Sequence, residues 1–366
     1  MKQMLFALLL AACARNTSVP APEATATNTP TTAPAAREPL TAIAQNLEVP
    51  WSLAFAPDGR IFFTERPGRV RVIENGALRP EPLHVFTDVA SRAEIGLMGL
   101  TLHPDFAQNR LLYIAYGLER GGGLAVDVVR FRETGRALAD PQPIVRNIPA
   151  ARFHAGCRLK FGPDRKLYIT TGDATDRNIA QDLASLGGKI LRVNDDGSVP
   201  ADNPFRGSPV WTLGHRNPQG IDWDPKSGLL FSTEHGPSGF DGGFGGDEVN
   251  IIERGQNYGW PEIHHRQTRA GMVAPFLEYT PACAPASAAF WRGDFYFGCL
   301  RGEHLHRVVF DPADRRKVVR QEKLFAELGR IREVAVGRDG ALYFSTSNRD
   351  GRGDARDRDD RIFRLE

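Results

Sequence analysis

The chain has 366 residues and carries 46 Lys and Arg against 44 Asp and Glu, a formal net charge of +2. This near balance disfavours a nucleic-acid-binding protein, which needs a surplus of cations to neutralise phosphates. Hydrophobic residues make up 41% and charged residues 25% of the chain, values typical of a folded protein, so the composition excludes disorder over the whole length.

The N-terminus has the layout of an export signal. Lys2 precedes an uncharged run, residues 4–12, that is too short to span a bilayer, which takes about 20 helical residues. The sequence LAAC at the end of this run is typical of a bacterial lipobox, so residues 1–12 are predicted to be a lipoprotein signal peptide and Cys13 the lipidated residue; ordinary signal cleavage nearby is the alternative. Residues 13–39, rich in Ala, Thr and Pro, are predicted to be a disordered tether. We expect a lipid-anchored protein of the bacterial cell envelope that faces the periplasm.

From residue 40 onward one pattern recurs six times: an apolar alternating run, a tight polar turn and a second apolar run. The aspartates of these turns are at positions 58, 105, 164, 224, 294 and 339. Pro, Asp and Gly in such turns favour hairpins, and a unit that recurs every 45 to 70 residues is typical of a β-propeller. We therefore predict an all-β fold, a six-bladed propeller with four-stranded antiparallel blades over residues 40–366. One of the runs 361–365 and 42–49 is expected to complete the blade of the other and close the ring.

Two segments at the starts of repeats carry candidate polar site residues. His154 precedes the third copy and is a candidate general base at the mouth of the channel, although an isolated His is more often structural. Arg216 and Asn217 open the fourth copy and offer a forked cation and an amide to a carboxylate or carbonyl group, with a capping pair in a loop as the alternative.

Two further segments suit a metal ion and an anion. Gly236 and Pro237 form a turn that exposes carbonyl oxygens near Asp247 and Glu248, and hard oxygen donors of this kind suit Ca²⁺. Arg330 and Arg332 alternate along one predicted strand, which places them on one face and calls for an anion between them; Arg301 is a third such cation. Together these segments predict a polyanionic cofactor site.

Three cysteines lie within the repeats. Cys283 and Cys299 are 16 residues apart on what are predicted to be neighbouring strands, so a disulfide or a pair of buried thiols remains open, and Cys157 lies beside the candidate base. No CxxC motif occurs, which disfavours a zinc site or a redox dithiol.

A set of motifs in the repeats resembles one family. These motifs are WSLAFAPDG at 51–59, GLMGLTLHPDF at 96–106, HAGCR at 154–158, GGKILR at 187–192, GHRNPQG at 214–220, EHGP at 234–237 and GDEVN at 246–250. They are similar to the glucose/sorbosone dehydrogenases, and specifically to the soluble aldose sugar dehydrogenases that use pyrroloquinoline quinone (PQQ). The resemblance runs from about residue 46 to residue 365.

The resemblance implies a six-bladed propeller that oxidises the anomeric carbon of an aldose to the lactone. His154 would take the proton of the C1 hydroxyl while hydride passes to the quinone, and Glu94 would contact the sugar. The residues that would hold the carboxylates and quinone oxygens of PQQ are Arg216, Asn217, Arg301, Arg330 and Arg332. The carbonyls of Gly236 and Pro237 would ligate the Ca²⁺ that polarises PQQ, and Glu248 with Tyr258 would hold a second, structural Ca²⁺.

The chain departs from the family pattern at two positions. Arg301 replaces a Lys at the quinone, which keeps the charge but changes the donor geometry, and Cys157 stands where Gly is common. Longer insertions of strictly glucose-specific members are absent, which favours a broad aldose range. The implied partners are an aldose and an external electron acceptor, a quinone or a redox protein, with the chain a monomer or homodimer. The alternatives are a non-catalytic propeller lipoprotein that binds sugar or protein, and a calcium-dependent propeller lactonase.

Overall fold

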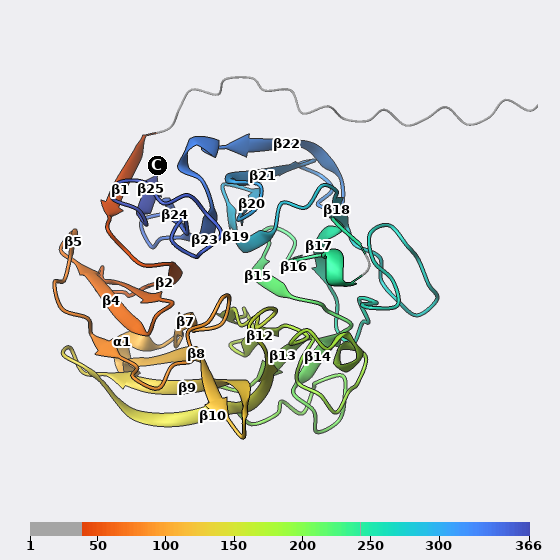
Figure 1. The fold of residues 1–366 in the computed structure, drawn as a ribbon, viewed down its shortest axis with the longest axis horizontal. Coiled ribbons are helices and arrows are strands. Elements are labelled where there is room, and N and C mark those ends of the chain that lie inside the picture. Colours follow the sequence, from red (N-terminus) through yellow and green to blue (C-terminus); the bar gives the residue numbers. More distant parts are fainter. Residues whose placement is uncertain (1–38, 242) are drawn as a thin grey trace, which may run out of the picture. The chain divides into compact units, whose positions relative to one another are not determined.

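The computed structural model describes residues 39–366 apart from residue 242, so the predicted signal peptide, Cys13 and all but the last residue of the predicted tether lie outside the described residues. The described chain is built from antiparallel sheets arranged in a ring, with the single short helix α1 (Phe106–Asn109) and the 3-10 turns η1 (Arg177–Ala180), η2 (Gly239–Asp241) and η3 (Ala326–Leu328) between strands (Figure 1). The six sheets confirm the predicted six-bladed propeller.

The blades follow one another along the chain, each with four strands, and the first blade adds β6, which also pairs with β4. The first blade contains β2 (Pro50–Phe55), β3 (Ile61–Glu65), β4 (Arg69–Glu74), β5 (Ala77–Leu78) and β6 (His84–Val85), and the second contains β7 (Leu97–Leu102), β8 (Leu111–Arg120), β9 (Gly123–Glu133) and β10 (Leu138–Ala150). The third blade contains β11 (Leu159–Phe161), β12 (Leu167–Thr171), β13 (Lys189–Val193) and β14 (Val210–Leu213), and the fourth contains β15 (Pro218–Trp223), β16 (Leu230–Glu234), β17 (Asp247–Ile252) and β18 (Leu277–Tyr279). The fifth blade contains β19 (Pro285–Trp291), β20 (Asp294–Cys299), β21 (His304–Phe310) and β22 (Val318–Leu324), and the sixth contains β23 (Ile331–Val336), β24 (Leu342–Thr346), β25 (Ile362–Leu365) and β1 (Leu40–Ala44).

The recurring turn aspartates lie at the turns between the first two strands of the blades, and in three blades the aspartate, Asp164, Asp294 or Asp339, also holds an arginine of the third strand. In the last blade, Asp339 Oδ1 accepts the N–H of Ala341, and its Oδ2 accepts the Tyr343 hydroxyl at 3.0 Å and Arg364 Nε at 2.8 Å. The third blade repeats this arrangement around Asp164. The repeat that the sequence shows is therefore a hairpin turn, and in these blades the aspartate of the turn also ties the third strand to it.

The hydrophobic core is divided among the spaces within and between neighbouring blades. Phe231 on β16 is fully buried, and its ring packs against aromatic rings of the next blade, Phe290, Phe295 and Phe310, with ring centroids 5.1 to 5.7 Å apart. The alternating apolar residues of the strands supply these contacts, because every second side chain of a strand points to the same face.

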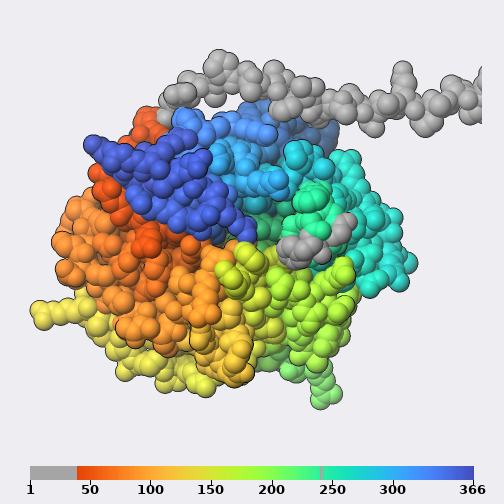
Figure 2. Space-filling model, viewed as in Figure 1, coloured from red at the N-terminus to blue at the C-terminus, as the bar shows by residue number. Residues whose placement is uncertain are grey.

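The ring is closed by the first and last strands of the described chain. β1 pairs with β25 in antiparallel register, with Leu40 opposite Leu365 and Ala42 opposite Phe363. In Figure 2 the atoms at the start of the described chain (red) accordingly lie beside those at its end (blue). The expectation that one terminal run completes the blade of the other is confirmed.

Antiparallel order also decides where the loops gather. The inner strands are β2, β7, β11, β15, β19 and β23, and each begins at the same end of the ring at which the second strand of its blade finishes. The loops that enter the inner strands and the loops that follow the second strands therefore share one face. Among the described residues, none of the helices has the length and apolarity that crossing a membrane requires.

Removal of β1 tests the closure of the ring. We expect a chain that begins at residue 46 to lose about 2–4 kcal/mol of unfolding free energy relative to one that begins at residue 39, because the ladder between β1 and β25 is lost and each of its hydrogen bonds is worth about 1 kcal/mol. Urea unfolding followed by circular dichroism measures the difference. Equal midpoints for the two chains would show that β1 is not a closing strand.

Candidate active site

A cavity of about 900 Å³ lies on the face where these loops gather. Its lining comes mainly from the loops before β7, β11, β15, β19 and β23 and from the loops after β3, β16, β20 and β24. Most of the residues predicted to form the site line it, namely Glu94, His154, Arg216, Gly236, Pro237, Arg301, Arg330 and Arg332. The structure thus brings together side chains that are up to 238 positions apart in the sequence, from Glu94 to Arg332.

His154 is held by a carboxylate that the sequence analysis did not identify. Its Nδ1 lies 2.7 Å from Oδ1 of Asp173, and Oδ2 of Asp173 accepts the indole N–H of Trp260 at 2.8 Å. A carboxylate only accepts hydrogen bonds, so Nδ1 of His154 donates to Asp173, and in the neutral tautomer that matches this contact the lone pair is on Nε2. This tautomer suits a general base.

Glycine at position 172 makes the close approach of this loop to His154 feasible. A Cβ atom there would lie 1.9 Å from the carbonyl oxygen of His154 and 3.0 Å from Oδ1 of Asn217. No side chain fits at such a distance, so the step from β12 to Asp173 requires glycine.

Arg330 and Arg332 lie on one side of the cavity and share one carboxylate, as their predicted position on one face suggested. Oδ2 of Asp350 accepts Arg330 Nε at 2.9 Å and Arg332 Nη2 at 3.2 Å. Burial acts to raise the pKa of Asp350, but the two guanidinium groups outweigh it and lower the pKa below its usual range. Burial lowers the pKa of Arg332 to about 10, and the neighbouring arginines act in the same direction. One carboxylate therefore serves two buried cations.

Arg216, in the loop before β15, is held by a different carboxylate. Its Nε and Nη2 donate to Oδ2 of Asp241 at 3.0 and 2.5 Å, and Nη2 also donates to the Ser238 hydroxyl. Asn217, the next residue, does not line the cavity. Its Oδ1 accepts the N–H of Gly156 at 3.2 Å, and its buried Nδ2 has no partner among the described residues.

Arginines outnumber carboxylates around the cavity. Its lining includes seven arginines and three carboxylates; the arginines that the sequence analysis missed are Arg66, Arg152 and Arg352. Nε of Arg66 is buried without a hydrogen-bond partner among the described residues, and burial lowers the pKa of this side chain. An anionic ligand would supply the acceptors and the negative charge that this lining lacks.

Glu94 joins the base to the rim of the cavity. One oxygen accepts the backbone N–H of His154 at 3.0 Å, and the other lies 3.3 Å from Nη1 of Arg352. Arg352 in turn lies over the ring of Phe153. Arg301, which is exposed, also lies at the rim.

The turn predicted to bind calcium lies in the wall of the cavity. Asp247 holds it, since its Oδ1 accepts the N–H of Gly236 at 2.8 Å and its Oδ2 accepts the N–H of Ala284 at 2.7 Å. Burial raises the pKa of Asp247, and these N–H groups act against that rise. Among the described residues, the carbonyl oxygens of Gly236 and Pro237 accept no hydrogen bond, so they are available to a cation.

His235 also lines the cavity, and the sequence analysis did not identify it. Burial, followed by the charge of Arg216, lowers its pKa well below the usual range, and its Nε2 has no hydrogen-bond partner among the described residues. The signal for Asp173, His235, Asp350 and Arg66 was available in the repeats: each follows the second apolar run of a copy by one to four residues, where the loops open onto this face.

Glu248 and Tyr258 lie outside the cavity and have different partners. Glu248 faces Glu234 and Glu278 across neighbouring strands and accepts Asn250 Nδ2 at 2.9 Å. Burial and then the charge of Glu234 raise the pKa of Glu248 well above its usual range. The Tyr258 hydroxyl donates to the carbonyl of Ile251 at 2.7 Å, which leaves only its main chain for the predicted metal role.

Comparisons with known proteins identify one family. The family model for glucose/sorbosone dehydrogenase matches residues 47–355. The aldose sugar dehydrogenase YliI of Escherichia coli K12 is 32% identical over 338 residues, which cover 83% of this chain and 89% of that protein.

Solved structures agree with this match. A crystal structure of a putative glucose dehydrogenase from Thermus thermophilus superimposes with a TM-score of 0.85 at 46% identity, covering 90% of this chain and 100% of that one. The PQQ-bound aldose sugar dehydrogenase of Streptomyces coelicolor superimposes with a TM-score of 0.80 at 35% identity, covering 91% of this chain and 99% of that one.

Substitution of Asp350 tests the charge balance of the cavity. We expect Asp350→Asn to lower the unfolding free energy of the ligand-free chain by about 3–5 kcal/mol at pH 7, because two buried guanidinium groups lose their carboxylate. The lowered pKa of Asp350 means that its contribution is complete above the usual carboxyl pKa of about 4 and is lost as the pH falls through the folded-state value. The difference between variant and wild type should therefore shrink in acid.

Urea unfolding at several pH values measures this effect. Asp354→Asn, at an exposed position near the same loop, is the matched control and should have no effect. A loss at pH 7 that persists unchanged in acid would contradict the assignment.

Proposed function

Because the chain belongs to the glucose/sorbosone dehydrogenase family, we propose that it oxidises aldose sugars at the anomeric C1 hydroxyl to the lactone with PQQ as its bound redox cofactor. The observation that carries the proposal is the arginine-rich cavity beside the His154–Asp173 pair. A lactonase would need carboxylates and amides converging on a calcium ion at the axis, and the arginines of this cavity argue against that reading.

The donors of the cavity fit a tricarboxylate quinone. Arg330 and Arg332 share Asp350, and Arg66 has a buried N–H without a partner among the described residues, so carboxylates of a ligand would complete their hydrogen bonds. Arg216, in the loop before β15, and Arg301, at the rim, would supply further donors. Asn217 does not line the cavity, so it would support the loop at Gly156, whose N–H it accepts, without contacting the cofactor. Bound PQQ supplies the electrophile that accepts hydride from C1 and later passes electrons to an external acceptor.

His154 is the proposed base. Its Nε2 lone pair takes the proton of the C1 hydroxyl, and Asp173, hydrogen-bonded to Nδ1, holds the ring in that tautomer and stabilises the imidazolium that forms. Asp173 is thus a positioning residue. Glu94 holds the backbone of His154 and, at the rim, reaches toward the sugar.

Two calcium sites are part of the proposal. At the cavity, the carbonyl oxygens of Gly236 and Pro237 would hold a Ca²⁺ ion, and Asp247 would fix their turn. The second site would use Glu248, whose neighbours Glu234 and Glu278 make this a carboxylate-rich position, and the main-chain carbonyl of Tyr258. The buried Asn250 Oδ1, which lacks a partner among the described residues, is a further oxygen donor there.

Location and partners extend the proposal. Signal cleavage before Cys13 and its lipidation would attach the propeller, residues 40–366, to the cell envelope through the tether 13–39, facing the periplasm. The electron acceptor would be a quinone or a redox protein. A Cys13→Ser chain should be released in unlipidated form, as metabolic labelling with a fatty acid and fractionation would show.

Reconstitution tests the activity and the base. The protein supplied with PQQ and Ca²⁺ should reduce a dye in the presence of several aldoses, and His154→Gln should lower kcat by about 10²–10⁴-fold while PQQ binding persists. His103→Gln is the matched control, because His103 lines a separate cavity at the other end of the inner strands. Failure of every aldose together with absence of PQQ binding would overturn the proposal, and an undiminished rate for His154→Gln would overturn the role of the base.

Substitution of an arginine tests cofactor recognition separately from catalysis. Arg332→Gln should weaken PQQ binding by about 10²-fold, since a buried charged hydrogen bond to a carboxylate is worth roughly 2–5 kcal/mol. Arg338→Gln, at an exposed position of the other cavity, is the control. Equilibrium titration of PQQ absorbance measures both. Equal affinities would remove Arg332 from the cofactor site.

A further inference from the structure

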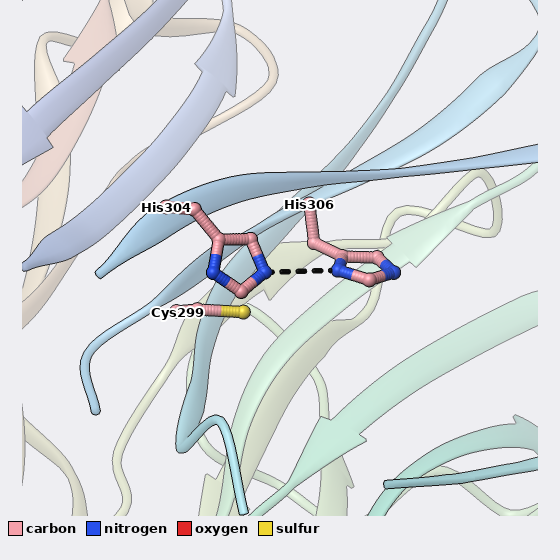
Figure 3. Close-up of side chains that lie close together, drawn as sticks. All are labelled: Cys299, His304 and His306. Atoms are coloured by element: carbon pink, nitrogen blue, oxygen red, sulfur yellow. Dashed lines mark hydrogen bonds between the residues drawn. The ribbon is translucent and has the colours of Figure 1, made fainter. Parts of the chain in front are cut away.

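A cluster of buried metal-binding side chains lies in the fifth blade, outside the proposed active site. Cys299 ends β20, and His304 and His306 are two residues apart on β21, with Cys299 paired opposite His304. Their potential ligand atoms all lie within 4.8 Å of one another, and each residue is at most 5% exposed. Figure 3 shows the two imidazole rings side by side, with the sulfur of Cys299 close to them.

The hydrogen bonds of the His304 and His306 rings leave a lone-pair nitrogen of each ring facing that of the other. Nδ1 of His304 lies 2.7 Å from the carbonyl of Gly302, which only accepts, so the proton of that ring is on Nδ1 and the lone pair on Nε2. Nε2 of His306 lies 2.9 Å from Oε1 of Gln321, so its lone pair is on Nδ1. Yet these two lone-pair nitrogens are 3.0 Å apart.

A cation between the rings would relieve this conflict. A proton is a poor candidate, because the site is apolar: His306 stacks on Phe297 and lies against Tyr279. A transition-metal ion accepts both lone pairs and also takes the nearby sulfur as a thiolate.

We propose that Cys299 Sγ, His304 Nε2 and His306 Nδ1 bind a zinc ion. Zinc holds sulfur at about 2.3 Å and nitrogen at about 2.0–2.1 Å, which places ligand atoms roughly 3–4 Å apart, so small side-chain adjustments bring these atoms into range. Binding converts the Cys299 thiol to a thiolate and releases its proton to solvent. Cys283, whose thiol is in hydrogen-bonding contact with that of Cys299, is the nearest candidate for the fourth ligand.

The ion would stiffen one wall of the active-site cavity. Cys299 and His304 flank a four-residue turn, residues 300–303, that carries Leu300 and Arg301 into the cavity lining. The carbonyl of Leu300 accepts Arg330 Nη1 at 2.9 Å, so the turn also supports the arginine cluster. Cys283 lies between two further lining residues, Ala282 and Ala284. The zinc ion would therefore hold the cavity wall at residues 300–303 in place without contacting the proposed cofactor.

Metal analysis of the full-length, untagged chain tests the site independently of PQQ and enzymatic activity. Protein produced with zinc and calcium in the medium should retain one zinc per chain after dialysis, as measured by inductively coupled plasma mass spectrometry, which separates zinc from calcium. Metal-free wild-type protein titrated with Co²⁺ should show a thiolate-to-cobalt charge-transfer band and tetrahedral d–d bands. This readout needs no variant.

Variants assign the ligands. Cys299→Ser and His304→Gln should abolish retained zinc and the cobalt–thiolate band, whereas Cys157→Ser, at another buried cysteine, and His103→Gln should keep both. Two results would overturn the proposal: a folded wild-type chain that neither retains zinc nor forms the cobalt band, or a Cys283–Cys299 disulfide found by mass spectrometry in protein from an oxidising compartment, since it would remove the sulfur ligand.

Discussion

Closure of the ring by β1 and β25 is the constraint on which the rest of the structure depends. The two strands come from opposite ends of the described chain, and their pairing holds the last blade against the first. In the closed ring, the loop before every inner strand and the loop after every second strand lie on one face, because the strands of each blade are antiparallel. The cavity, the arginines and His154 are consequences of that arrangement rather than of any single segment.

Charge is the second organising feature. In a protein of net charge +2, the lining of one cavity includes seven arginines and three carboxylates, and Asp241, outside the lining, pairs with Arg216. Asp350 illustrates this shortage of negative charge, because one of its oxygens accepts hydrogen bonds from both Arg330 and Arg332. Such an excess of positive charge lowers the stability of a ligand-free protein, and the binding of an anion would offset that loss.

The candidate base and the buried cations are held by different carboxylates. His154 is fixed by Asp173, Trp260 and Glu94, whereas the cations are fixed by Asp241 and Asp350. The proposed zinc ion would add a third support behind the wall at residues 300–303. Each support joins segments from different blades or strands. Two contacts also link the supports to one another, since Glu94 holds both His154 and Arg352 and the carbonyl of Leu300 accepts Arg330.

The sequence by itself determined the repeating hairpins, the number of blades, the shared face of Arg330 and Arg332 and the position of His154 at the start of an inner strand. These features follow from local periodicity and turn chemistry, which act over a few residues. Only the tertiary structure decided that Asp173 holds His154, that Asp350 bridges two arginines, that Asn217 lies behind the cavity wall and that Cys299 faces two histidines on the neighbouring strand. Those contacts depend on strand register and blade order, and the same residue types occur at many other positions in the chain. The physical reason is that the closed ring decides which loops meet at the shared face. A sequence pattern of a few residues cannot predict which side chains of those loops will pair.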